Sequence, residues 1–207
     1  MKSHLSVALS LLVLLSLAAP AITAQEAQKR PQIKVEKVEV DDIQSPDYNA
    51  TSQPEDTDRE DWLKISVIYE SEGGEDGWLD NVRFKWYVLL LNGRTPKMMT
   101  TADVTYNDVE SGEEHEAAVF MRPKTIKRHY DDSGNVSKRD LLLHVEVTVD
   151  NFQVAAFDYP RRRANVPDQW WQNPTVNRVK HGLLPRDRTP FAPLEWDSYE
   201  FIVPENQ

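Results

Sequence analysis

The sequence predicts an all-β fold, a sandwich of about seven to eight short strands followed by a proline- and tryptophan-rich C-terminal strap. Three observations support this prediction. Apolar and polar residues alternate in several short segments, turn signals separate these segments, and no apolar run keeps the helical period except over residues 177–184. We therefore expect a single domain whose core lies between two sheets.

Residues 1–24 have the three parts of a secretory signal peptide. A basic start precedes the apolar run Leu5–Ala19, and small residues lead to Ala24, after which we expect cleavage. Cleavage after Ala21 is the alternative, because Ile22 stands where a smaller residue is preferred. The apolar run is shorter than the roughly 20 residues of a spanning helix. A retained anchor is therefore less favoured, and we expect no membrane span after cleavage.

The mature chain, residues 25–207, is long enough for one domain with its own core. Its net charge goes from −10 to −11 because Lys2 is removed with the leader. Nucleic acid and anionic lipid bind clustered cations, so neither is an expected partner. The chain has no Cys, which excludes a thiol nucleophile, a lipid anchor on cysteine and disulfides. Exported chains without disulfides are commoner in bacteria, and we expect a periplasmic, extracellular or cell-surface location.

Eight segments are predicted to be strands: residues 33–40, 62–70, 81–91, 98–106, 113–121, 141–149, 152–157 and 198–203. The clearest is 81–91, where Phe84, Trp86 and Val88 share one face. Asn92-Gly93 signals a turn that Pro96 should lengthen. The expected core includes ten residues of these strands: Leu63, Ile65, Val67, Val82, Phe84, Trp86, Val88, Leu143, Val145 and Val147.

Two segments of the mature domain are expected to lie outside the sheets. Residues 41–61 combine prolines with many carboxylates, which predicts an acidic loop or linker. Residues 158–196, here called the strap, contain six prolines and should run extended across the sandwich, pinned by aromatic side chains. The run Arg161–Arg163 within the strap is interpreted as solvated, with contact to an acidic partner or a proteolytic site as the alternatives.

The inventory of acids, bases and nucleophiles is poor. His115 is expected on a solvated strand face, and with Glu113 it offers too few ligands for zinc. His144 is expected to be a hydrogen-bonded structural residue. Asp131–Asn135 lacks the Glu that ends a calcium loop and predicts a plain turn. We therefore predict no catalytic residue, no cofactor and no metal site, and an unrecognised hydrolase is the least favoured alternative.

Trp170, Trp171, Trp196 and Tyr199 form the most prominent cluster of aromatic residues in the sequence. Exposed aromatics anchor protein interfaces and stack on sugar rings. The simplest interpretation is that they pin the strap to the sandwich. A surface for a protein partner is the second interpretation, and a carbohydrate surface is the third.

The stretch Lys85-Trp86-Tyr87-Val88-Leu89 is similar to the strand of immunoglobulin-like domains whose Trp packs between the sheets. Residues 82–91, 116–130 and 189–199 together resemble an uncharacterised family of secreted bacterial pilus-like proteins with an immunoglobulin-like fold. The resemblance covers under a quarter of the chain. It implies a structural role at the surface or on pili, with self-association, and it carries over no functional residue.

From these observations we expect a non-enzymatic, exported structural or interaction protein of the bacterial periplasm or cell surface. A more specific form of this expectation is a pilus-associated protein. Its partner would be another protein or a second copy of itself. The alternative is a carbohydrate-binding module that uses Trp170, Trp171 and Trp196 to bind a glycan.

Overall fold

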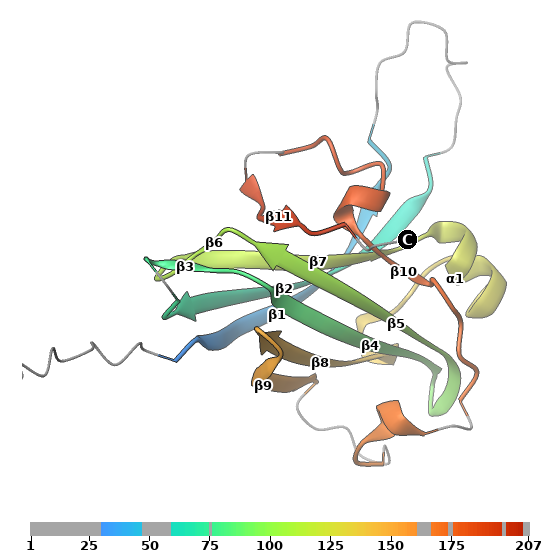
Figure 1. The fold of residues 1–207 in the computed structure, drawn as a ribbon. Helices are drawn as coiled ribbons and strands as arrows, with labels where there is room; N and C mark the ends of the chain where they lie inside the picture. The colour runs from blue at the N-terminus through green and yellow to red at the C-terminus, as the bar shows by residue number, and fades with distance from the viewer. Residues whose placement is uncertain are drawn as a thin grey trace, which may run out of the picture.

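The computed structural model describes residues 30–46, 59–74, 76–160, 167–173, 176–195 and 198–204. The leader 1–24, the run Arg161–Arg163 and Trp196 lie outside the described residues. The described residues form a two-layer sandwich with one short α-helix, which confirms the predicted all-β fold (Figure 1).

One layer is a four-stranded antiparallel sheet in the order β1-β2-β7-β10. Its strands are β1 (Gln32–Gln44), β2 (Asp61–Glu72), β7 (Glu114–Met121) and β10 (Leu183–Pro185). The two longest runs of pairing join β1 to β2 and β2 to β7, so residues far apart in the chain form the centre of this sheet.

The other layer is a five-stranded antiparallel sheet in the order β11-β5-β4-β8-β9. Its strands are β11 (Phe201–Ile202), β5 (Thr95–Asn107), β4 (Val82–Asn92), β8 (Leu141–Val149) and β9 (Phe152–Tyr159). A separate ribbon joins β3 (Trp78–Leu79) to β6 (Val109–Glu110). The eight expected strands are all present, and β3, β6 and β10 are additional short ones.

The core lies between the two sheets, as predicted. All ten residues expected there are buried, and Trp86 is fully enclosed beside Phe84, with ring centroids 6.1 Å apart. This places Trp86 between the layers, where the immunoglobulin-like resemblance implied it would be. The core is continuous and draws on both sheets, the β3–β6 ribbon and Ile126 of the helix.

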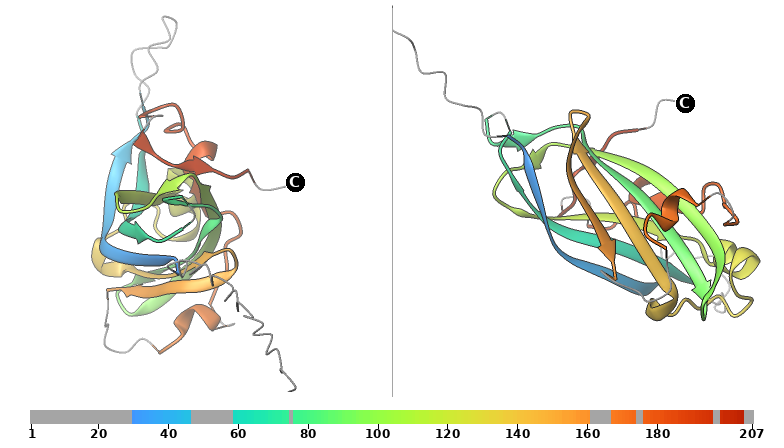
Figure 2. Two further views of the ribbon diagram at one scale, coloured as in Figure 1. Left: turned by 60° about the vertical axis from the view of Figure 1, so that its left-hand side comes forward. Right: turned by 90° about the horizontal axis from the view of Figure 1, so that it is seen from below.

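Both outer faces of the sandwich are also partly covered. The short helical turn η2 (Trp170–Gln172) lies against the five-stranded sheet, and η3 (Arg186–Arg188) with Phe191 lies against the four-stranded sheet. Figure 1 shows this C-terminal path, orange to red, passing from one side of the sandwich to the other, and the end view in Figure 2 shows it on both sides. The strap is therefore pinned to both sheets.

Several local predictions need correction. The acidic loop is shorter than 41–61, because residues 41–44 continue β1 and pair with residues 61–64 of β2. The β4–β5 connection is a tight two-residue turn at Gly93, and Pro96 fits because the register shifts between Leu90 and Leu91. Residues 177–184 are not helical, since Arg178 forms a parallel bridge to Met99 and Leu183 begins β10.

The helix of the described residues is α1 (Pro123–His129), which the periodicity did not predict. Pro123 occupies its first turn, where the missing N–H costs nothing, and three basic residues occupy its last turn. The helix and the 3-10 turn η1 (Lys138–Asp140) lie between β7 and β8 along the chain. The turn at Asp131–Asn135 is confirmed, with the Ser133 N–H donating to Asp131 Oδ1 at 2.8 Å.

Candidate functional site: aromatic and histidine clusters around the sandwich

Trp170 and Trp171 lie on the outer face of the five-stranded sheet, but they differ in exposure. Trp170 is buried in a cluster with four residues of β4, β5 and β8: Leu89, Leu91, Met99 and Leu142. Trp171 is half-buried and meets Trp170 edge to face, with ring centroids 5.8 Å apart. Arg178 donates from Nη2 to the Trp171 carbonyl at 2.9 Å and holds this turn in place. Trp170 is thus a packing residue, and Trp171 alone of this pair has substantial exposed surface.

The His144 ring packs against one face of the Trp171 ring. The two rings are stacked, with centroids 3.5 Å apart and planes 7° from parallel. His144 Nδ1 lies 2.9 Å from Asp158 Oδ1, and its Nε2 lies 3.7 Å from Glu146 Oε1. Glu146 in turn accepts a hydrogen bond from the Tyr87 hydroxyl at 3.2 Å. The expectation of a hydrogen-bonded structural histidine is confirmed, and one face of the Trp171 ring is already covered.

Tyr199 lies in a different cluster, around Arg186. The Arg186 guanidinium is 4.3 Å from the centre of the Tyr199 ring and donates from Nη2 to the Leu194 carbonyl at 2.9 Å. The Tyr199 hydroxyl donates to the Ala192 carbonyl. Trp170 and Trp171 contact the five-stranded sheet, whereas this cluster contacts the four-stranded one, so the predicted aromatic residues do not form one surface.

Phe191 joins the Arg186 cluster to the sheet. Its ring packs edge to face on Trp62 with centroids 5.7 Å apart, and it stacks on Phe120 at 5.3 Å. Thr189 shapes the turn before it, since its hydroxyl donates to the Arg186 carbonyl at 2.7 Å and accepts from the Phe191 N–H at 3.2 Å. The part of the stretch 189–199 that the structure describes up to Glu195, which carried part of the family resemblance, therefore covers the outer face of the sheet.

His115 is not on a solvated face, and this corrects the sequence-based expectation. Its side chain is only 6% exposed and packs beside the ring of Tyr69, with centroids 5.3 Å apart. Nδ1 pairs with Glu200 Oε1, and Nε2 lies 2.6 Å from the Glu110 carbonyl. The Glu110 carbonyl can only accept, so Nε2 donates; with Glu200 ionised, Nδ1 donates as well and the imidazole is cationic. The acidic neighbours of His115 suggested solvent, but it lies on the core face of β7 with Ala117 and Val119, and Glu200 covers its end of that face.

The environment of His115 acts on its pKa in opposite directions. Burial lowers the pKa, whereas the hydrogen bonds to Glu200 and to the Glu110 carbonyl raise it, and the net result is a raised pKa. The cation and the Glu200 carboxylate therefore form a buried pair. This pair fastens the segment before β11 to β7 of the opposite sheet.

Ser71, His115 and Glu200 have the composition of a hydrolase triad, but their geometry does not suit catalysis. The Ser71 hydroxyl donates to the Glu110 carbonyl at 2.7 Å, and its oxygen is 3.4 Å from His115 Nε2. Since Nε2 itself donates to the same carbonyl, it has no lone pair to accept a proton from Ser71. Ser71 is also completely buried. The set therefore acts as a structural lock.

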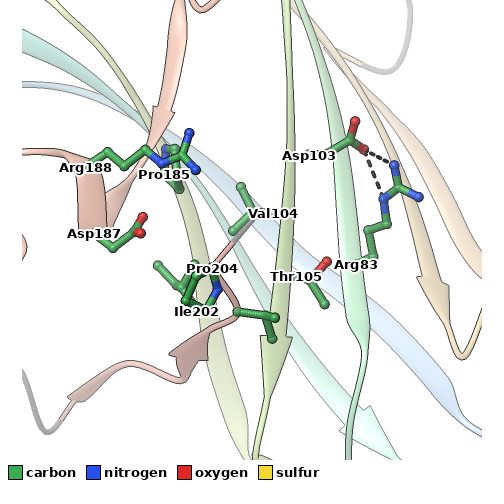
Figure 3. A pocket seen from close by; sticks show the side chains of 10 residues that line it. Arg83, Asp103, Val104, Thr105, Pro185, Asp187, Arg188, Ile202 and Pro204 are labelled. Carbon is green, nitrogen blue, oxygen red and sulfur yellow. Dashed lines mark hydrogen bonds and ion pairs between the residues drawn. The ribbon is translucent and has the colours of Figure 1, made fainter. Parts of the chain in front are cut away.

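The hollows on the surface are polar. One of about 260 Å³ lies between β5 and η3; Arg83 pairs with Asp103 at 2.9 Å on one side of it, and Asp187 and Arg188 lie on the opposite side (Figure 3). A second hollow, of about 370 Å³, lies at Asn81, Arg83 and Asp150. Ligand pockets are mainly apolar, unlike these two. Within the described ranges, no three His, Asp or Glu side chains are placed to hold a metal ion. No helix in that same part of the chain has the length and apolar character needed to cross a membrane.

The fold and these clusters define a β-sandwich protein whose aromatic and histidine groups are largely committed to holding its own C-terminal segment. A protein-family model matches residues 24–206, and the chain belongs to the family that this model represents. The crystal structure of a protein from Akkermansia muciniphila is similar, with a TM-score of 0.73 and 24% sequence identity over 86% of this chain and 95% of that chain. This likeness shows a shared fold. No curated protein matches the chain.

Sequence reasoning missed the two residues that organise the C-terminal segment. Arg186 lies among prolines, and Glu200 lies in a predicted strand, so neither had a local signal of burial. The pairing of Glu200 with His115 joins residues 85 positions apart. A strand histidine beside an aromatic residue of the neighbouring strand was the available hint, but the register of β2 against β7 was needed to use it.

Proposed function

We propose that this chain is an exported, non-enzymatic structural or interaction protein of the bacterial periplasm or cell surface. A pilus-associated role is the narrower form of this proposal, and it rests on the family resemblance. The observation that carries the proposal is an open sheet edge. Among the described residues, β9 pairs only with β8, and it has a single charged residue, Asp158. Edges of this kind form protein contacts by adding a strand.

Two further observations support a role without catalysis. The triad-like set at His115 has no free base for a nucleophile, because both ring nitrogens donate to fixed acceptors. The two hollows beside Arg83 are more polar than a typical substrate pocket. A leader sequence and an acidic mature chain agree with an exported protein that makes contacts outside the cytoplasm.

Cross-linking in intact cells, followed by mass spectrometry, tests the proposal. We expect cross-links from the mature domain to a second copy or to another envelope protein, and a mature N-terminus at Gln25 or Ile22. A domain that stays free of any protein cross-link would contradict the interaction role. Hydrolase activity of the purified protein that is lost in Ser71→Ala would contradict the non-enzymatic role.

A carbohydrate-binding module remains the second candidate, and Trp171 is the observation that favours it. Its half-buried ring lies on the outer sheet face beside Glu146 and Asp158, groups that could bind sugar hydroxyls. A glycan array decides between the candidates. Binding that is lost in Trp171→Ala but kept in Trp78→Ala, an exposed tryptophan of β3, would favour the carbohydrate role.

A further inference from the structure

The four edges of the two sheets are protected to different degrees. β10 is three residues long and ends in Pro185. The outer edge of β5 is covered by β11 and by the parallel bridge from Arg178. The edge strand β1 alternates Lys, Glu and Asp side chains and has a register shift at Glu36. Charges and bulges of this kind prevent strands from pairing with other chains.

β9 has fewer of these protections: its register against β8 shifts at Val154, and β1 of the other sheet lies close to it. It is eight residues long and, apart from Asp158, uncharged, with Ala155 and Ala156 in its middle. Phe152 at its start is 76% exposed, the most exposed large apolar residue among those described. The view from below in Figure 2 shows β8 and β9, in orange, in front of the other layer. Within the part of the chain that the structure describes, no strand pairs with the outer edge of β9.

The hydrogen-bond pattern shows which groups of β9 point outward. Met99 and Thr105 of β5 bond to the strap and to Val203, so odd-numbered residues of β5 point away from β4. Antiparallel pairs alternate between bonded and non-bonded positions. The pairing registers of β5, β4, β8 and β9 carry this alternation across the sheet. The N–H and C=O groups of Ala156 and Asp158 therefore point outward from β9.

We propose that β9 pairs antiparallel with β9 of a second copy, about a two-fold axis at Ala156. This inference rests on the proposed interaction role and names the partner. At the axis, Ala156 of each copy would exchange both backbone hydrogen bonds with Ala156 of the other, which makes the contact self-complementary. The result is a continuous ten-stranded sheet formed from the two five-stranded sheets.

Charge determines the direction of the pairing and favours a second copy. In parallel, in-register pairing, Asp158 would lie opposite Asp158, and like charges directly opposite are unfavourable. In antiparallel pairing about Ala156, Asp158 lies opposite residue 154, a valine. A chain with net charge −10 repels its copies least where its surface has few charges, and β9 has only Asp158. The exposed Phe152 would be covered at the end of the other copy's strand.

The test uses charge at the axis. Ala156→Lys and Ala156→Glu each place like charges opposite one another, because the two-fold axis brings position 156 of both copies together. Sedimentation velocity over a concentration series should show a wild-type dimer, and we expect each variant to raise the dissociation constant by about tenfold or more. An equimolar mixture of the two variants should restore dimers, since opposite charges then meet. Thr101→Lys, an exposed position on β5, is the matched control and should dimerise as wild type does.

Three results would overturn the pairing at β9. These are a wild-type chain that stays monomeric at high concentration, variants that dimerise as tightly as wild type, and a mixture that dimerises no better than either variant alone. Each variant should fold, because the side chain of Ala156 is exposed. Circular dichroism of each variant checks this. A monomeric wild type that still cross-links to another envelope protein in cells would remove this inference and leave the proposed function standing.

Discussion

Replacing Arg186 with Met should loosen the segment that covers the outer face of the four-stranded sheet. Arg186 is only 8% exposed, and Met retains most of its apolar stem. The change removes a charged hydrogen bond to the Leu194 carbonyl at 2.9 Å, a longer one to Phe191, and the cation–π contact with Tyr199 at 4.3 Å. The ion pair with Glu195 adds little, because that carboxylate is 75% exposed.

The magnitude follows from these contacts. A charged hydrogen bond contributes about 1.5–3 kcal/mol and a partly buried cation–π contact about 0.5–2 kcal/mol, partly offset by the cost of burying the cation. We expect Arg186→Met to cost about 3 kcal/mol, which lowers the melting temperature by roughly 6–12 °C in a domain of this size. Arg188→Met, an exposed neighbour on the same turn, is the matched control and should change it little.

Thermal denaturation followed by circular dichroism measures the total loss, and amide hydrogen exchange locates it. Exchange should increase in residues 186–202 and stay slow in β2, β4 and β8, because only the covering segment loses contacts. A melting temperature equal to wild type would refute the reasoning. It would mean that the stacking of Phe191 on Trp62 and Phe120 holds the segment without Arg186.

Three further predictions concern other buried groups. Because the pKa of His115 is raised on folding, its pair with Glu200 stabilises the fold fully below the unfolded histidine pKa of about 6.5 and loses this effect as pH rises through the raised value. Glu200→Gln should flatten that fall in urea denaturation across neutral pH, and an unchanged slope would contradict the pairing. Trp86→Ala should lower the free energy of unfolding by about 3–5 kcal/mol. Trp86→Phe should lower it less, because Trp86 Nε1 has no hydrogen-bond partner to lose among the described residues. An unchanged urea midpoint in the alanine variant would disprove the place of Trp86 in the core. Trp170→Ala should cost about 3 kcal/mol, and Trp171→Ala clearly less because that side chain is only partly buried. Equal losses would contradict the division of roles between them.

Strand prediction worked where burial on one face imposed alternation. Residues 62–70, 81–91 and 141–149 were found because their side chains must alternate between the core and the outside. Prediction failed where local pattern and tertiary cover disagree. His115 stands among acidic residues that suggest solvent, yet it lies on the core face of β7, and Glu200 from the far end of the chain pairs with it. The seven-residue helix α1 is too short to show a period.

The sequence by itself determined the all-β class, the ten core residues and the segment of the chain that would act as a strap, because alternation and proline content are local properties. Only the tertiary structure decided what the strap does. It divided the aromatic residues between the two outer faces, made Arg186 the centre of one cluster and joined His115 to Glu200. It also left β9 as the edge with the fewest charges among the longer edge strands. These features depend on strand order and on contacts between distant residues, which no local pattern specifies.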